Sequence, residues 1–199
     1  MIYITFLATI IPSFLIGFYI YNKDKYEKEP IQLVLKSFLF GCLSIIPTFI
    51  IEISIESLES LDLFLYVLIG VATVEEGIKF FFLKKYLFPH KEFNEPFDGI
   101  IYAVMISLGF ATVENIFYVF IYNESDLSVA LLRMFSAVPL HATCGVIMGY
   151  YAGEAKFDKK RQNLLLFVGV LGAVALHCLY DYFLFLGKGQ ILSFIALAI

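Results

Sequence analysis

The sequence predicts an all-α, polytopic transmembrane helix bundle with six spans plus a short apolar C-terminal segment. Of its 199 residues, 60% are hydrophobic and only 16% are charged, which lies far outside the averages of soluble domains. The apolar residues also gather in runs as long as the roughly 20 residues that a helix needs to cross a bilayer. No linker or low-complexity segment divides these runs, so residues 1–199 are expected to form a single domain.

The six predicted spans cover residues 2–22, 31–53, 61–83, 97–122, 129–152 and 163–186. The first run starts without charge and its lysines follow it, which predicts a retained helix and not a secretory signal. Residues 190–199 are apolar but about half as long as a span needs. A re-entrant tail, an interfacial end and a truncated seventh helix all remain open for them.

Basic residues predict the orientation of the bundle, because lysine and arginine near the ends of spans stay cytoplasmic. Loops 23–30, 84–96 and 153–162 hold ten of them, whereas only Lys188 lies on the opposite side. We therefore expect a multi-pass protein of the cell membrane with an extracytoplasmic N-terminus, surrounded by membrane lipid. No basic patch extends beyond these loops, which excludes nucleic-acid binding.

A short motif occurs twice, as GVATVEE at residues 70–76 and as GFATVEN at residues 109–115. Because consecutive spans run in opposite directions, the pair is a local antiparallel duplication, like the inverted repeats of transporters. Its glycine and alanine let neighbouring helices approach closely, and its threonine can bond to a neighbour or back to its own helix. The glycines at 145, 149 and 153 predict a similar packing stripe on one helix face.

Seven ionisable residues lie well inside four of the predicted spans. They are Glu75, Glu76, Lys79, Glu114, His141, His177 and Asp181. Since each such group is costly near the bilayer centre, we expect the seven to face one shared polar cavity near the midplane. Helical spacing predicts an ion pair between Glu75 and Lys79 and a contact between His177 and Asp181.

Four other charged residues lie nearer to the ends of spans: Lys36, Glu52, Asp98 and Arg133. Long side chains in such positions can reach the membrane surface, so these four are expected to need no partner in the cavity. The three cysteines lie within spans without a CxxC pair, which predicts neither a disulfide framework nor a zinc knuckle.

Carboxylates and imidazoles around a wet pocket are the groups needed to activate a water, protonate a leaving group and stabilise an oxyanion. The same residue types can form a metal site of the Glu/His kind, although no HExxH motif is present. Glu76, Glu114, His141 and His177 are the candidate ligands, and zinc is the possible ion. A purely structural role remains open for each residue, most of all for His141.

Four short motifs in this order resemble the PrsW family of intramembrane proteases, which are relatives of the CAAX-prenyl endopeptidases and of the APH-1 scaffold subunit. EEGIK at 75–79 matches EExxK, FATVE at 110–114 matches FxxxE, and HCLYD at 177–181 matches HxxxD. HATCG at 141–145 supplies a further histidine, and PFDGIIYA at 96–103 also fits. The endopeptidase relatives usually have FxxxH and HxxxN at two of these places, so the metal question stays open.

The resemblance implies a hydrolase that makes the first cut, at site 1, in a membrane-anchored anti-sigma factor during the envelope-stress response. By similarity, Glu75 and Glu76 are the water-activating pair and His177 is an essential partner, with Glu114 and His141 completing the cavity. We expect His177, aided by Asp181, to stabilise the tetrahedral intermediate. Lys79 is expected to keep one carboxylate ionised.

Two other classes of protein remain open from the sequence. An ion or solute transporter would also need carboxylates at the midplane and an inverted pair of helices. A non-catalytic, APH-1-like membrane scaffold would use the same residues to bind a partner and not to turn over a substrate.

Overall fold

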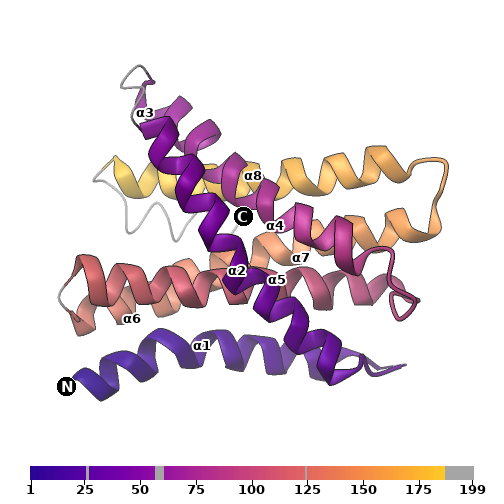
Figure 1. Cartoon of the computed structure of the whole chain (residues 1–199), viewed down its shortest axis with the longest axis horizontal. Helices are drawn as coiled ribbons and strands as arrows, with labels where there is room; N and C mark the ends of the chain where they lie inside the picture. Colours follow the sequence, from indigo (N-terminus) through magenta and orange to yellow (C-terminus); the bar gives the residue numbers. More distant parts are fainter. Residues whose placement is uncertain (26, 57–60, 124, 187–199) are drawn as a thin grey trace.

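The computed structural model of the chain is built from helices (Figure 1). It describes residues 1–25, 27–56, 61–123 and 125–186. Within these ranges no strand is formed, which confirms the predicted all-α fold. The predicted C-terminal segment, residues 190–199, lies outside the described residues.

Among the described residues, five stretches are long and apolar enough to cross a membrane, and they coincide with five of the six predicted spans. They are α1 (Ile2–Lys23), α2 (Ile31–Glu56), α5 (Pro96–Ile116) continued by the π-helix η3 (Phe117–Tyr122), α6 (Leu127–Phe135) with α7 (Ala137–Phe157), and α8 (Gln162–Phe185).

The remaining predicted span, residues 61–83, is the third along the chain. It is helical but is built from four consecutive pieces. They are α3 (Leu63–Leu65), the π-helix η1 (Tyr66–Ala72), α4 (Thr73–Phe82) and the π-helix η2 (Leu83–Leu87). In a π-helix each N–H bonds five residues back, and such turns are frequent at functional sites. Thr73 shows the wider turn, since its backbone N–H donates to the carbonyl of Leu68 five residues earlier. The Thr73 hydroxyl donates to the same carbonyl at 2.6 Å.

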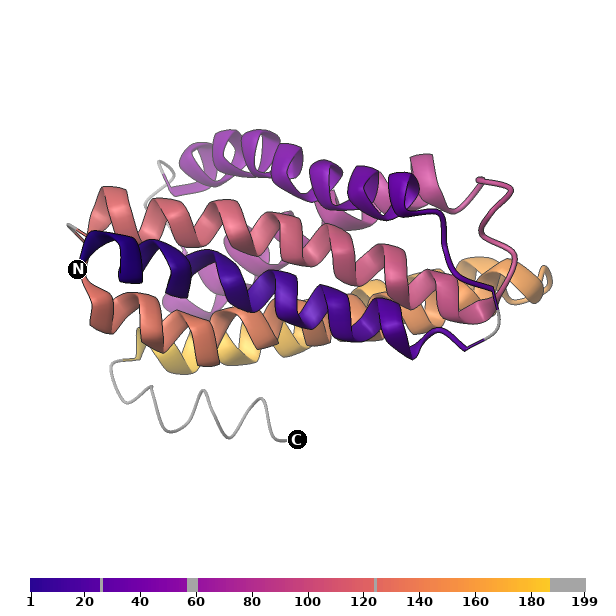
Figure 2. The same cartoon turned by 90° about the horizontal axis from the view of Figure 1, so that it is seen from below.

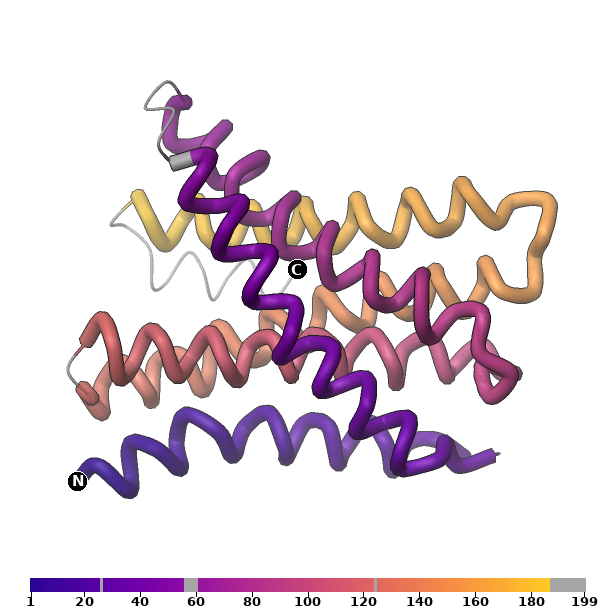
Figure 3. Tube along the Cα trace, viewed as in Figure 1, coloured from indigo at the N-terminus to yellow at the C-terminus, as the bar shows by residue number. Residues whose placement is uncertain are grey.

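The central helix of the bundle is α5, which packs against α1, α2 and α7, while α8 packs against α7 (Figure 2). Helix α2 crosses α5 obliquely (Figure 1). We call the end of the bundle at which α1 begins the N-terminal end (left in Figure 3). The last residues of α2, η3 and α8 lie at the same end. The far end holds the connections at residues 24–30, 88–95 and 158–161.

Glycines set the close packing around α5, as the small-residue motifs predicted. A Cβ atom on Gly145 would lie 2.8 Å from the Cα of Val104, and one on Gly149 would lie 2.6 Å from the Cα of Ile100. Gly109 of the second repeat meets the backbone of α2 at Phe38, whereas Gly70 of the first repeat only meets side chains. The glycine of the second copy therefore packs against backbone, and that of the first does not.

Buried carboxyl groups join the α1–α2 connection to α5 at the far end. The Tyr102 hydroxyl donates to Glu29 Oε2, and the backbone N–H groups of Asn94 and Glu95 donate to Asp98 Oδ2 at 2.8 and 2.6 Å. Glu29 and Asp98 are 3% and 0% exposed. The expectation that Asp98 reaches the membrane surface is therefore wrong, because its carboxylate instead caps the first turn of α5.

Candidate active site

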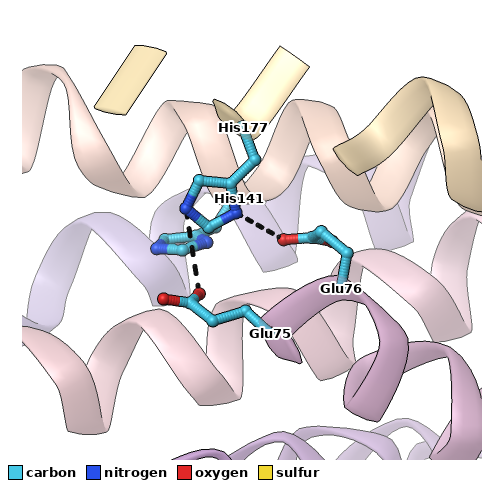
Figure 4. A group of neighbouring side chains, drawn as sticks. All are labelled: Glu75, Glu76, His141 and His177. Carbon is cyan, nitrogen blue, oxygen red and sulfur yellow. Dashed lines mark hydrogen bonds and ion pairs between the residues drawn. The ribbon is translucent and has the colours of Figure 1, made fainter. Parts of the chain in front are cut away.

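The seven ionisable residues predicted to meet in one cavity do come together, from α4, α5, α7 and α8. Figure 4 shows four of them, with the side chains of Glu75, Glu76, His141 and His177 converging from three helices. All four are at most 4% exposed. The contacts among these side chains confirm the prediction that they lie together. Their catalytic roles stay predictions.

Lys79 lies at the centre of this group, where its ammonium contacts both glutamates of its own helix. Its Nζ lies 3.1 Å from Glu75 Oε2, as predicted, and 2.8 Å from Glu76 Oε1. It also lies 3.1 Å from His141 Nδ1 and 3.9 Å from the centroid of the Phe110 ring. One buried cation thus compensates two neighbouring carboxylates that would otherwise repel each other.

His177 is held between two carboxylates on different helices. Its Nδ1 lies 2.9 Å from Glu76 Oε1 on α4, and its Nε2 lies 3.2 Å from Asp181 Oδ2 one turn along α8. The second contact confirms the pairing predicted from the i, i+4 spacing. Both ring nitrogens face acceptors, so this arrangement suits an imidazole protonated at both nitrogens.

His141 belongs to a second branch of the network, which runs outward to α6. Its Nε2 lies 2.9 Å from Glu114 Oε2, and the same oxygen accepts from Arg133 Nη2 at 2.7 Å. An ammonium can only donate, so the Lys79 contact makes Nδ1 of His141 the acceptor and leaves the proton on Nε2. His141 therefore donates to Glu114 as a neutral imidazole.

Arg133 also belongs to this network, although its position in the sequence predicted that it would reach the membrane surface. Its Nε also donates to Asn115 Oδ1 at 2.6 Å, and its guanidinium lies 4.1 Å from the centroid of the Tyr118 ring. The signal available in the sequence was the lack of any basic partner for Glu114 within its own helix, whereas Glu75 and Glu76 have Lys79.

A cavity of about 570 Å³ opens beside this network in the N-terminal half of the bundle. Its polar lining comes from Glu52, Glu75, Glu114, Arg133, His141, His177 and Asp181, and most of the remaining lining is aliphatic or aromatic. Glu76 and Lys79 do not line it. Glu75 is thus the member of the glutamate pair that a molecule in the cavity can touch.

The group formed by Glu75, Glu76, His141 and His177 has the composition of a metal site. When one donor atom is taken from each of the four residues, these four atoms all lie within 4.8 Å of one another. Glu76 Oε2 is buried without a hydrogen-bond partner among the described residues. Each imidazole also has a carboxylate at its Nε2, as metal-binding histidines commonly have at the nitrogen turned away from the ion. The four residues are therefore of the types that hold a metal ion, and the Lys79 ammonium contacts two of their donor atoms, Glu76 Oε1 and His141 Nδ1.

The cysteines take no part in this site. Cys144 and Cys178 are buried and Cys42 is partly buried, and all three are free thiols.

The sequence model of a family described as PrsW family intramembrane metalloprotease matches residues 29–199. Proteins named Protease PrsW are similar to most of the chain. The one from Geobacillus kaustophilus is 37% identical over 182 residues, which covers 89% of this chain and 78% of that protein. Those from Oceanobacillus iheyensis and Bacillus subtilis are 38% and 37% identical, each covering 89% of this chain and 81% of its own length. No solved structure has significant similarity to the chain.

Proposed function

The chain belongs to the PrsW family of intramembrane proteases, and on that premise we propose that it hydrolyses a peptide bond of a single-span membrane protein inside the 570 Å³ cavity. The observation that supports this site is the convergence of Glu75, Glu76, His141 and His177 at the wall of a chamber large enough for an extended peptide segment. A pocket of this size is in the usual range for ligand sites.

Glu76, His141 and His177 are the proposed ligands of a zinc ion, because two histidines and one glutamate leave a catalytic zinc one free position. A bound zinc ion supplies Lewis acidity that polarises a carbonyl oxygen. Glu114 and Asp181 orient the two imidazoles through their Nε2 atoms. In this assignment His177 would hold the ion through an unprotonated Nδ1 while its Nε2–H donates to Asp181, so it has no free N–H for an oxyanion.

Glu75 is the proposed general base, since it is the glutamate of the pair that lines the cavity. It takes a proton from the attacking water and passes that proton to the leaving amine nitrogen as the peptide bond breaks. Lys79 contacts Glu75 Oε2 at 3.1 Å and so favours the ionised carboxylate that accepts the proton.

The proposed substrate is a membrane-anchored anti-sigma factor cut at site 1, the substrate that the sequence resemblance implies. The cavity lies in the N-terminal half of the bundle, and the proposed orientation puts the N-terminus outside the cytoplasm. Together they favour cleavage toward the extracytoplasmic side. The clustering of ten basic residues at the far end supports that orientation.

The proposal is tested by cleavage of a single-span reporter protein in liposomes, with zinc content measured on the same samples. The Glu75→Gln variant should keep its zinc and lose activity by about 10²-fold or more, because a general base contributes roughly 10²–10⁴-fold. Glu76→Gln should lose both zinc and activity, and a chelator should inactivate the wild type. Glu154→Gln, which changes an exposed glutamate of α7, is the control. Full cleavage by Glu75→Gln, or ion flux without any cleavage by the wild type, would contradict the proposal.

A further inference from the structure

Four carboxylates line the cavity, and they differ in whether a basic group accompanies them. Glu75 pairs with Lys79, Glu114 pairs with Arg133, and Asp181 pairs with His177. Glu52, from α2, forms no ion pair with any described residue. Its Oε1 is buried and has no hydrogen-bond partner in the described part of the chain.

Glu52 lies on the α2 wall of the cavity, and α2 contributes none of the proposed metal ligands. The rest of the α2 wall is apolar and consists of Ile45, Ile46, Phe49, Ile50 and Ile53. The expectation that Glu52 reaches the membrane surface is therefore wrong for Oε1, which is buried on this wall. An ionised carboxylate without a partner in such surroundings is costly, and either a proton or a cationic group of a ligand can compensate it.

The surroundings of Glu52 suit a cationic partner better than a neutral one. Aromatic side chains line the same cavity, among them Phe49, Tyr66, Phe117 and Tyr118, and the rings of Phe49 and Phe117 lie parallel with centroids 6.5 Å apart. Aromatic faces attract ammonium and guanidinium groups, most strongly where water is scarce. A carboxylate in a cavity lined by aromatic rings thus suits a lysine or arginine side chain.

We propose that Glu52 determines substrate specificity by binding a lysine or arginine side chain of the substrate close to the bond that is cut. This inference rests on the proposed function, because it names what the same cavity selects. Glu52 contributes binding and not chemistry, so it acts on KM more than on kcat.

The first experiment changes only the substrate, so that folding of the enzyme is not in question. Each single-span reporter in a set carries one lysine at a different position around the cleavage site. Each is compared with a reporter that has norleucine at the same position. Norleucine keeps the aliphatic stem and lacks the charge. At one position the wild type should cleave the lysine reporter with KM about tenfold lower, as expected for a charge pair in a partly desolvated site.

The second experiment changes Glu52 and measures the same reporters. Glu52→Gln should remove the preference for lysine, so that the lysine and norleucine reporters are cleaved with equal KM. Glu52→Lys should prefer a reporter with glutamate at the selected position, which a merely structural role would not produce. Glu154→Gln removes one negative charge from the exposed part of α7 and is the matched control.

The outcomes separate this inference from the proposed function. If the wild type cuts no reporter, the proposed function fails, and the inference fails with it. If the wild type cuts lysine and norleucine reporters equally at every position, the proposed function stands and the role of Glu52 is overturned. An unchanged lysine preference in a folded Glu52→Gln variant also overturns it.

Discussion

At the scale of single residues, Arg133 shows how a charged side chain outside the sequence motifs can support the site. It neutralises Glu114 and ties it to Asn115, and Glu114 in turn accepts from His141. We call Arg133 a positioning residue, because its contacts are with Glu114 and Asn115 and not with the proposed metal ligands.

Arg133→Gln should lower kcat by about tenfold or more, because removing one partner of a partly buried pair leaves the other charge uncompensated. KM should change much less, and Arg133→Lys should recover part of the loss. The measurement is steady-state cleavage of the reporter, with Arg161→Gln as control, since Arg161 forms an exposed pair with Asp158. Equal kcat values for Arg133→Gln and the wild type would contradict the positioning role of Arg133.

Glu29, at the far end and outside the membrane-spanning segments, predicts a pH effect on stability. Burial, the hydrogen bond with Asp98 and the negative charges of Asp98, Asp24 and Glu92 raise the pKa of Glu29 from 4.5 to about 9. Between these two values the folded protein binds a proton that the unfolded chain releases. Stability should therefore be highest at acid pH and fall as pH rises through this window.

Glu29→Gln should flatten this pH dependence, because the amide can still accept from Tyr102 and donate to Asp98 but cannot ionise. The measurement is the thermal midpoint in detergent between pH 5 and pH 9, with Glu154→Gln as the exposed control. An undiminished slope in the Glu29→Gln protein would assign the pH effect to other groups.

The sequence identified the residues of the site better than their contacts. The high cost of ionisable groups in lipid singled out the seven residues that meet, and the i, i+4 rule gave the Glu75–Lys79 and His177–Asp181 pairs. Adjacent residues of a helix point about 100° apart, yet the side chain of Lys79 reaches both Glu75 and Glu76. The contacts of Arg133 and Glu52 depend on how separate helices pack, which no spacing within one helix reveals.

At the scale of the elements, the apolar runs predicted the helices to within a few residues but not their interruptions. The predicted span 129–152 is a pair of helices, α6 and α7, that meet at Ser136. Pro139 explains the break, because its ring clashes with the carbonyl of Phe135 four residues earlier, where α6 ends. The π-helical turns of η1 and η3 have no such marker in the sequence.

The packing of α5 against α7 gives a stability prediction with a control inside the chain. Gly149→Ala should destabilise the protein by about 1–3 kcal/mol, since its Cβ would lie 2.6 Å from the Cα of Ile100. Gly77→Ala meets nothing within 4 Å and should stabilise by up to about 1 kcal/mol through helix propensity. Thermal unfolding in detergent gives both values, and equal effects at the two positions would refute the close packing.

At the scale of the whole molecule, the two ends of the bundle differ in what they hold. The cavity and its charged lining lie toward the N-terminal end, and the basic connections and the buried Glu29–Asp98 group lie at the far end. In the proposed orientation, this difference between the two ends places the proposed site toward the extracytoplasmic side of the membrane.

The proposed orientation can be tested with single cysteines. In intact cells, an impermeant maleimide should label Ile2→Cys, at the N-terminus, and should label Lys91→Cys only after permeabilisation. Both positions are exposed, and the wild type, whose three cysteines lie within helices, gives the background. The reverse labelling pattern would place the basic loops outside and overturn the orientation.

The position of Lys79 has a consequence for how the protein matures. Because its ammonium already balances Glu75 and Glu76, the pocket is electrically compensated before any ion arrives. The newly made chain can therefore insert and assemble in the bilayer first, and the proposed zinc ion would bind afterwards. Apoprotein prepared with a chelator should regain its activity on addition of the metal, without passing through an unfolded state.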